Sequence, residues 1–420
     1  MHTRLGLIFA LGIMIDGTFL IGQTTWIRNA HPLLSTGPSG SWEDASVILP
    51  YVLKESTGFK MWYYGDDSST TRIGYATSND GTTWTKHPGN PVLDVGLAGS
   101  WDDASLLDPM VLFDGSNYHM WYGGFDGSTR MIGHALSEDG ISWTKTGSNP
   151  VLDLGASGSW DDFEHRQPFV LLDGPLFRMW YTGADGTNQR FGYATSSDGI
   201  SWTKYDGNPI MDVGEIGDWD SIWLASPRII YQGSSFEMFY SAFSEGKIQI
   251  GYATSSDGLT WTKFSGNPVL TPGPNGAWDD KFLFVGSVIF SGTSYDMWYT
   301  GFDGSTWRIG QADAQAVIIS VDYFGNSIRK FELAQNYPNP FNPVTTLRYA
   351  LPQSAHVLLV IYDVNGREVR RLVDGFQPPG DYQILWDGRI EHGRHIPSGV
   401  YIARLVTPAY AKAVKMVLLK

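Results

Sequence analysis

The chain contains no cysteine among its 420 residues. Disulfide bonds and metal sites built from thiolates are therefore excluded, and cysteine usage leaves the cellular compartment open. No long stretch of the chain has the periodicity of an amphipathic helix. Its 49 glycines and 22 prolines instead indicate many turns, and a hydrophobic content of 42% is enough for a large core. Together these features predict an all-β protein.

Long hydrophobic runs are also scarce. Arg4 precedes an apolar run at residues 5–15, and a second run at residues 18–22 follows Asp16. This region is too short and too interrupted to span a membrane, so no transmembrane segment is expected. Residues 1–22 have the pattern of a secretory signal peptide, and the alternative is a buried N-terminal strand.

Positive charge is scarce in most of the chain, which has a formal net charge of −14. The first 329 residues contain 18 basic and 36 acidic residues, whereas residues 330–420 contain 11 basic and 7 acidic residues. A field of this sign does not favour nucleic acid as a partner. The difference in charge also indicates two domains of different kinds.

The acidic part of the chain repeats every 59 residues. Each repeat has a tryptophan, a Met-aromatic-Tyr motif and a glycine at matching positions, namely Trp42, Trp101, Trp160, Trp219 and Trp278, Met61, Met120, Met179, Met238 and Met297, and Gly74, Gly133, Gly192, Gly251 and Gly310. Each also has four short strand-like runs, as at residues 46–53, 59–65, 72–77 and 82–86. Four strands per repeat are typical of a β-propeller blade, so five repeats predict five blades.

The ends of the repeated region indicate how the ring closes. The last repeat stops after residues 309–314, without its final turn and strand. The missing piece matches residues 24–34, in which Trp26 takes the place of Trp84. We expect the N-terminal strand to complete the last blade, which would leave no open sheet edge in the ring.

Most repeated polar residues are expected to be structural. Asp80 and its equivalents lie in Ser-x-Asp-Gly turns, where a short carboxylate can accept backbone N–H groups. The acid pairs that follow the repeated tryptophans, from Glu43 and Asp44 to Asp279 and Asp280, are expected to cap connections rather than to bind a metal. We therefore expect no metal and no other cofactor.

One part of the repeat departs from this frame. Residues 100–115 and 159–174 begin and end alike, but their centres read Ser-Leu-Leu-Asp and Glu-His-Arg-Gln. These segments are the first strands of blades, which line the central channel of a propeller and converge at one end. The polar or aromatic candidates on the first strands of the middle three blades are Asp108, Glu164, His165, Arg166, Gln167, Trp223, Ser226 and Arg228.

Two interpretations of these residues remain open. Charges at a buried pole are unfavourable unless they are paired. They form either an internal salt-bridge cluster, with Asp108 and Glu164 against Arg166 and Arg228, or a polar pocket at the mouth of the channel.

The repeats, the Asp-Pro first strands, the Met-Trp-Tyr-Thr-Gly second strands and the Ser-Ser-Asp-Gly-x-x-Trp turns resemble the five-bladed glycoside hydrolases of families 32, 43 and 68 and the related family 130 mannoside phosphorylases. The resemblance covers residues 24–316. Families 32, 43 and 68 place an Asp in blade one, an Asp-Pro in blade two and a Glu in blade three. Here Leu49 occupies the first position, Asp108 fits the second, and Glu164 lies four residues before Pro168 instead of two.

This resemblance implies glycoside hydrolysis, which normally uses two carboxyl groups. Glu164 would be the acid, and Asp108 the base or the stabiliser of the transition state. The residues expected to bind substrate are His165, Arg166, Gln167, Trp223 and Arg228, with His165 as base or sugar ligand and Trp223 stacking on a sugar. Leu49 favours the alternative, a non-catalytic propeller that binds a glycan or a protein at the same mouth.

The repeat stops near residue 318, and residues 333–420 are expected to form a second domain after a linker at 319–332. Strand-like runs and the Asn365-Gly366 turn predict a small immunoglobulin-like β-sandwich. Residues 333–343, 398–405 and 411–420 resemble the C-terminal sorting domain of type IX secretion substrates. This resemblance implies the type IX machinery as a partner and a secreted or cell-surface location reached through the periplasm. The alternative is an ordinary immunoglobulin-like accessory domain.

Overall fold

The computed structural model describes residues 25–232, 235–320, 331–353, 355–377, 380–390 and 394–419, with only the backbone of residues 317–320 and 381. The regular secondary structure of these residues consists of strands, which confirms the all-β prediction. Within them no helix is long and apolar enough to cross a membrane. Most of the predicted signal peptide, residues 1–22, lies outside the described residues. There the structure gives only the backbone of β1 (Ile13–Ile15) and β2 (Thr18–Gln23).

The chain forms two compact units. The larger unit comprises Arg28–Ile289 and Asp296–Ala312, and the smaller comprises Met1–Ile27, Phe290–Tyr295 and Asp313–Lys420.

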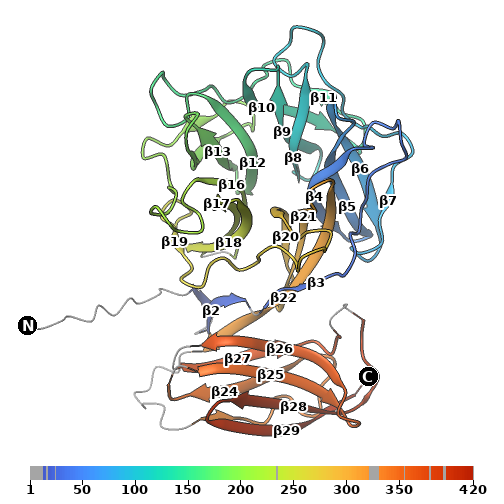
Figure 1. Ribbon diagram of the computed structural model, residues 1–420, viewed down its shortest axis with the longest axis vertical. Coiled ribbons are helices and arrows are strands. Elements are labelled where there is room, and N and C mark those ends of the chain that lie inside the picture. The colour runs from blue at the N-terminus through green and yellow to red at the C-terminus, as the bar shows by residue number, and fades with distance from the viewer. Residues whose placement is uncertain are drawn as a thin grey trace, which may run out of the picture. The chain divides into compact units, whose positions relative to one another are not determined.

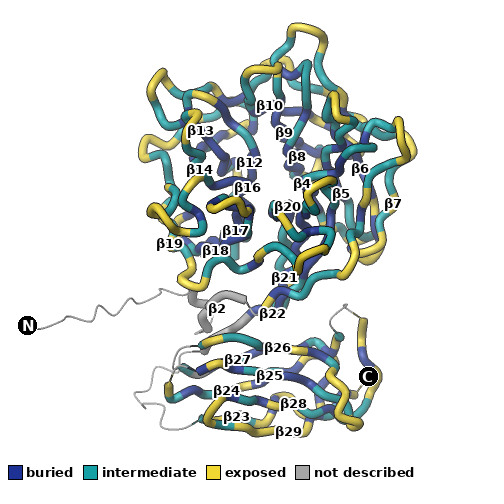
Figure 2. The backbone as a smooth tube through the Cα atoms, viewed as in Figure 1, coloured by how far each residue is buried: buried dark blue, intermediate teal, exposed yellow. Residues whose placement is uncertain are grey.

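The larger unit is built from successive four-stranded antiparallel meanders, whose inner strands surround a common centre (Figure 1). The first meander consists of β4 (Ser46–Glu55), β5 (Gly58–Asp66), β6 (Thr71–Ser78) and β7 (Thr85–Lys86), and the second of β8 (Ser105–Phe113), β9 (Tyr118–Phe125), β10 (Arg130–Ser137) and β11 (Thr144–Lys145). The third consists of β12 (Glu164–Asp173), β13 (Leu176–Ala184), β14 (Gln189–Ser196) and β15 (Thr203–Lys204). The fourth consists of β16 (Trp223–Tyr231), β17 (Phe236–Ser244), β18 (Lys247–Ser255) and β19 (Thr262–Lys263). β20 (Phe282–Phe290), β21 (Ser294–Phe302) and β22 (Trp307–Ser320) follow. The inner strands are mostly buried, and exposed residues concentrate in the loops (Figure 2).

The N-terminal segment supplies the outer strand next to β22. β3 (Ile27–Arg28) pairs with β22. Beyond β3, the backbone N–H of Asn29 donates to Gln311 at 2.9 Å, and that of Leu33 donates to Ile309 at 2.7 Å. The predicted pairing of the N-terminal strand with the last repeat is therefore confirmed.

One recurring hydrogen bond joins neighbouring meanders. An indole N–H on the second strand of one meander donates to a glycine carbonyl in the outer turn of the next, from Trp62 to Gly140, from Trp121 to Gly199 and from Trp180 to Gly258, each at 2.8 Å. Trp298 on β21 makes the same bond to Gly81 in the first meander, at 2.9 Å. Because the last meander contacts the first as neighbours contact each other, the meanders form a closed ring.

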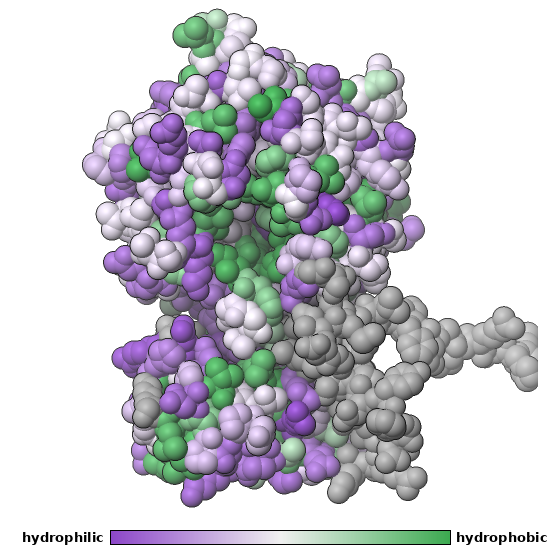
Figure 3. All heavy atoms as spheres, turned by 180° about the vertical axis from the view of Figure 1, so that it is seen from behind, coloured by the Kyte–Doolittle hydropathy of each residue, from purple (hydrophilic) through white to green (hydrophobic). Residues whose placement is uncertain are grey.

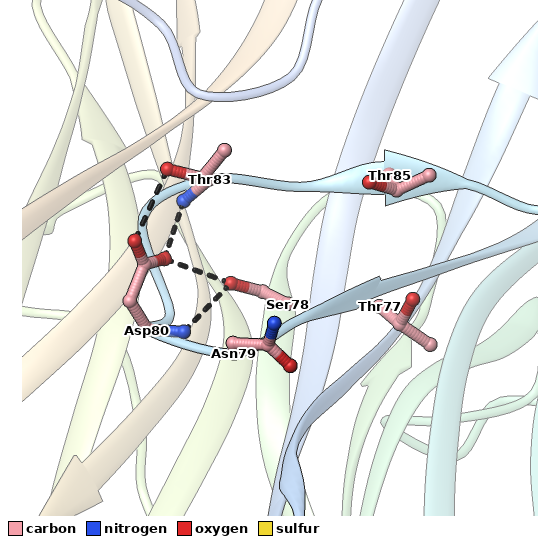
Figure 4. A pocket seen from close by; sticks show the side chains of 6 residues that line it. All are labelled: Thr77, Ser78, Asn79, Asp80, Thr83 and Thr85. Carbon is pink, nitrogen blue, oxygen red and sulfur yellow. Dashed lines mark hydrogen bonds between the residues drawn. The ribbon is translucent and has the colours of Figure 1, made fainter.

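The outer strand of each meander is shorter than predicted. Residues 82–86 were expected to form a strand, but β7 comprises only Thr85 and Lys86. The residues before it form a turn, in which Asp80 Oδ1 accepts the N–H of Thr82 at 2.8 Å. It also accepts the N–H of Thr83 at 2.7 Å (Figure 4). The φ of 77° at Gly81 favours glycine there. The predicted structural role of this aspartate is confirmed.

The acid pairs after the repeated tryptophans also have structural roles. In the second repeat, Asp102 is buried and pairs with Lys145 at 2.6 Å, while Asp103 accepts the N–H of Gly99 at 2.6 Å. The repeated methionines are fully buried in the core, as Met120 shows. The second acid of each pair therefore caps a connection, and the first forms a buried ion pair that ties the outer strand to the loop.

The smaller unit is a β-sandwich, as predicted. One sheet contains β23 (Glu332–Leu333), β24 (Thr345–Leu351) and β27 (Gly380–Trp386), and the other is ordered β26 (Glu368–Gln377), β25 (Ala355–Asp363), β28 (Gly399–Thr407) and β29 (Tyr410–Leu418). Leu347, Trp386 and Leu405 are fully buried in its core. The predicted turn at Asn365-Gly366 joins β25 to β26, and Gly366 donates its N–H to Asp363 at 3.0 Å.

Candidate functional site

A bulge interrupts the inner strands where each meets its proline. The residue before the proline has a left-handed backbone at four equivalent positions, with φ of 45° at Leu49, 54° at Asp108, 53° at Gln167 and 54° at Ser226. The pairing of β8 with β9 shifts at this point, between Leu107 and Met110. Residues with side chains adopt this conformation at a cost of roughly 1–2 kcal/mol each. Because the strain recurs around the ring, it belongs to the repeated frame.

Hydrogen bonds from side chains connect these bulges to their neighbours. Asp108 accepts the backbone N–H of Gln167. Gln167 in turn accepts the backbone N–H of Ser226 at 3.0 Å and the hydroxyl of Thr182 at 3.2 Å. Hydroxyl groups serve the same purpose between other meanders, with Leu49 donating to Thr300 at 2.8 Å and Val285 donating to Ser241 at 2.9 Å. Asp108 and Gln167, two of the predicted site residues, therefore help to hold the ring together.

Glu164 lies at the start of β12 between two guanidinium groups. Its Oε2 is 3.3 Å from Nη1 of Arg130, and its Oε1 is 3.3 Å from Nη2 of Arg166. The Glu164 side chain is 9% exposed. Both carboxylate oxygens are therefore engaged by arginine.

Asp108 belongs to the same charged group. Burial raises the pKa of Asp108 above its usual range, while Arg166, Arg130 and Arg228 oppose that rise. Burial, and then the charge of the nearby Asp108, raise the pKa of Tyr64 on β5. We call Asp108, Glu164, Arg130, Arg166 and Arg228 the acid–arginine cluster. Of the predicted salt bridges, Glu164 with Arg166 is formed, whereas Arg166 and Arg228 only act on the pKa of Asp108; Arg130 is an addition.

The acid–arginine cluster is buried at Arg228. Arg228 is 2% exposed, and it donates to the carbonyl groups of Gly286 and, at 3.0 Å, Pro227. The rings of Tyr51 and Phe169, from the first and third inner strands, lie 6.4 Å apart. Because these strands are not neighbours in the ring, this contact reaches across its interior and narrows the channel at that level.

His165 does not join the cluster. Its side chain is fully buried, with Nε2 3.0 Å from Asp161 and 3.4 Å from Lys204. Its ring packs against Tyr181 at 4.9 Å. Successive side chains of a strand point to opposite faces, so Glu164 and His165 cannot face the same side. The predicted role of His165 as base or sugar ligand is corrected to a structural one, in the buried ion pair of the frame.

Trp223 belongs to a row of aromatic rings that the sequence analysis did not identify. It stacks on Phe243 at 5.2 Å and on Phe284 at 5.9 Å. Phe284 lies 5.6 Å from Trp307, which stacks on Phe302 at 4.4 Å. We call these rings, together with Phe282, which stacks on Phe302 and Trp307, the aromatic shelf. All six are only partly buried.

The shelf and the cluster lie at the same end of the ring. Trp223 and Phe282 are the equivalents of Glu164 in the next two repeats, and Trp307 is the equivalent of Arg130. Equivalent positions in a closed ring share one level, so the shelf continues the cluster onto the last two meanders. We call this end the mouth. On the face drawn in Figure 3, hydrophobic side chains gather around a hollowed centre of the larger unit.

Solved structures share the fold of the larger unit. A structure from work on the GH130 family of mannoside phosphorylases, described as containing glycoside hydrolases that target β-1,2 mannosidic linkages in Candida mannan, has a TM-score of 0.56 to this chain. The alignment covers 72% of this chain and 96% of that chain at 18% identity. The larger unit therefore has the propeller fold of this structure. In the smaller unit, residues 343–407 match the FlgD Ig-like domain family.

Sequence relatives define the family more closely. The uncharacterized protein Rv1502 of Mycobacterium tuberculosis is 30% identical over 237 residues, which cover 53% of this chain and 76% of the relative. The chain belongs to the family of this protein. The beta-1,2-mannobiose phosphorylase of Thermoanaerobacter sp. is 25% identical over 119 residues, covering 25% of this chain and 38% of that enzyme.

Proposed function

We propose that the protein binds glycans at the mouth. The aromatic shelf carries this proposal, because partly exposed aromatic rings beside a few convergent polar groups are the usual composition of a small-molecule site. Trp223 and Phe284 offer partly exposed aromatic surface to the apolar side of a sugar ring. Arg166 and Glu164 offer hydrogen-bonding groups from the neighbouring meander. The similarity to mannoside phosphorylases and glycoside hydrolases supports a sugar as the ligand.

The state of the two acids favours binding over hydrolysis. A glycosidase needs one carboxyl group that holds a proton and a second that is free to act on the sugar. Both carboxylate oxygens of Glu164 are engaged by Arg130 and Arg166, which leaves neither of them free to act on a sugar. Asp108 is 4% exposed and is engaged by Gln167. Leu49 stands where the resembling hydrolases place a further aspartate.

Hydrolysis or phosphorolysis is the second candidate function. The fold and the enzyme relatives favour it, and the raised pKa of Asp108 would let this residue carry a proton. In this alternative Asp108 and Glu164 are the catalytic pair, and β-1,2-mannosides are the first substrates to test.

The test is a screen of the full-length protein against polysaccharides and oligosaccharides, with binding measured by calorimetry and products by chromatography. We expect binding without turnover. Trp223→Ala should weaken binding at least tenfold, whereas Tyr205→Ala, which removes an exposed aromatic ring on an outer loop, should leave it unchanged. Equal affinities of Trp223→Ala and the unchanged protein would refute the shelf. Turnover that Glu164→Gln abolishes would establish the second candidate.

We further propose a five-bladed propeller at residues 24–318, a linker at 319–332 and a sorting domain at 333–420. The closed ring and the Ig-like match support this division. The signal-peptide pattern and the sorting-domain resemblance support export by the type IX machinery to the medium or the cell surface. A chain that ends at Lys330 should stay in the periplasm of a host with this machinery, and its release at normal yield would contradict the proposal.

A further inference from the structure

The mouth carries arginine where the repeat does not require it. Arg130, Arg166 and Arg228 each have four equivalents in the other repeats, and all of these equivalents are uncharged. They are Thr71, Gln189, Ile248 and Trp307 for Arg130, Ile48, Leu107, Ala225 and Phe284 for Arg166, and Tyr51, Met110, Phe169 and Ser287 for Arg228. The ring therefore closes without a cation at these levels, and its frame does not explain the three arginines.

The acids of the cluster do not balance these cations. Arg130 and Arg166 pair with Glu164, and these two arginines and Arg228 all act on Asp108, so three guanidinium groups lie with two carboxyl groups. A further acid of the region, Asp66, directs its Oδ1 to the N–H of Ser68 at 2.7 Å, and within the described residues it forms no ion pair with these arginines. An excess positive charge among partly buried groups is less favourable than a balanced one, and an anion from a ligand would relieve it.

Arg130 and Arg166 have hydrogen-bond donors that Glu164 does not engage. Arg130 and Arg166 each use one terminal nitrogen on Glu164. The Nε atoms of both are buried and have no hydrogen-bond partner among the described residues. Guanidinium presents five N–H donors in a planar fork, which matches a carboxylate through two parallel hydrogen bonds. The terminal nitrogens of Arg130 and Arg166 that Glu164 does not engage are thus suited to a planar anion.

The aromatic shelf lies next to these donors. Trp223 begins β16, the inner strand that follows β12 in the ring, and it pairs with Gln189 at the start of β14. Gln189 is the equivalent of Arg130. A ligand of sugar size that packs on Trp223 therefore has the cluster beside it.

We propose that the mouth recognises an acidic glycan, in which a uronic acid ring packs on the aromatic shelf and its carboxylate binds Arg130 and Arg166. This inference rests on the proposed function and adds the chemical class of the ligand. The carboxylate supplies the negative charge that the acid–arginine cluster lacks.

The test compares acidic oligosaccharides with matched neutral ones on the full-length protein. The probes are oligomers of galacturonate, mannuronate and glucuronate, together with the same oligomers after chemical reduction of their carboxyl groups. We expect at least one acidic oligomer to bind at least tenfold more tightly than its reduced form. Equal affinity for the two forms, or binding of neutral glycans alone, would overturn the inference and leave the proposed function intact. If no glycan binds at all, both fail.

Variants locate the effect at the mouth. Arg166→Gln should weaken binding of the acidic oligomer at least tenfold and weaken binding of the reduced oligomer by a clearly smaller factor, so that the preference for the acid falls. Arg190→Gln is the matched control, because it also removes one arginine. Arg190 lies outside the acid–arginine cluster, where it pairs with the loop residues Asp185 and Asp212. Glu164→Gln should act in the opposite direction and tighten binding of the acid, since it releases two guanidinium groups. Weaker binding of the acid by a folded Glu164→Gln protein would contradict the inference.

Inorganic phosphate is the third probe. These arginines could bind a free anion instead of a carboxylate that belongs to the sugar, and phosphate tests that possibility. If phosphate binds to the unchanged protein but not to Arg166→Gln, and a neutral mannoside is then cleaved in its presence, the anion is not carried by the sugar and the inference is wrong. We expect phosphate at millimolar concentration to compete only weakly with the acidic oligomer.

Discussion

Replacement of Asp108 separates a structural role of this residue from a catalytic one. In the structure Asp108 is 4% exposed and accepts the backbone N–H of Gln167. Asp108→Asn keeps an acceptor oxygen and removes the charge, whereas Asp108→Leu removes both. Leu49 occupies the equivalent bulge with φ of 45°, so the frame already accommodates leucine in this backbone conformation. The two variants therefore differ mainly in the acceptor that they offer to Gln167.

The expected changes in the free energy of unfolding follow from these contacts. Loss of the acceptor leaves a buried N–H without a partner, so Asp108→Leu should destabilise the protein by about 1–3 kcal/mol. Asp108→Asn should change stability by less than about 1 kcal/mol, because it keeps the hydrogen bond. Burial raises the pKa of Asp108, so its contribution to stability is complete below the usual value and is lost as pH rises through the raised pKa. Asp108→Asn should abolish this part of the pH dependence.

The assay is urea-induced unfolding of each variant between pH 4 and pH 7, alongside the glycan-binding and turnover assays. If Asp108→Leu is as stable as the unchanged protein, the structural role is refuted. If Asp108→Asn keeps its stability but loses turnover of a glycoside by orders of magnitude, Asp108 is catalytic and the second candidate function is correct.

Three further predictions concern the frame. Burial lowers the pKa of His134 from its usual value of 6.5 to about 3. The stability that the neutral imidazole contributes is therefore complete above pH 6.5 and is lost as the pH falls towards 3. By pH 5 the free energy of unfolding should have fallen by about 2 kcal/mol. His134→Tyr, the residue at most equivalent positions, should lack this loss in urea titrations at pH 7 and pH 5. Thr300→Val should cost about 1–3 kcal/mol by leaving the N–H of Leu49 unpaired, whereas Thr144→Val on an exposed strand should be neutral; equal stability of the two would contradict the linkage. Deletion of residues 24–30 should sharply lower the melting temperature by exposing the edge of β22, and an unchanged value would show that β3 does not close the ring.

The repeat made most of the fold predictable. Each residue of the frame recurs every 59 residues, so a single motif such as Met61 or Asp80 was supported several times over. The length of the outer strand was not predictable in this way. The tryptophan at residue 84 reads as part of a strand, but in the structure Asp80 draws the preceding residues into a turn, and Trp84 donates to Gly81 at 3.0 Å.

The candidate site was only partly predictable. Glu164 and Arg166 were found because they break the repeat. His165 was misassigned because alternation along β12 turns it into the sheet packing. Arg130 and Trp307 were not predicted because they lie on the third strands of their meanders, whereas only the first strands were expected to line the channel. The 59-residue period could have identified them, because both lie at the position of the repeat that Thr71, Gln189 and Ile248 occupy in the other repeats.

Comparison of equivalent positions separates structure from chemistry in this ring. Where side chains differ but serve one purpose, as Gln167 and Thr300 both accept an N–H from a neighbouring bulge, the frame explains them. Where one repeat has a charge and the others have none, as at Arg166, the frame does not. Asp108 belongs to both groups, because it accepts a bulge N–H and also lies among the arginines. Its substitution therefore reports on stability and on ligand binding together, whereas Arg130 and Arg166 report on the ligand with less interference from the fold.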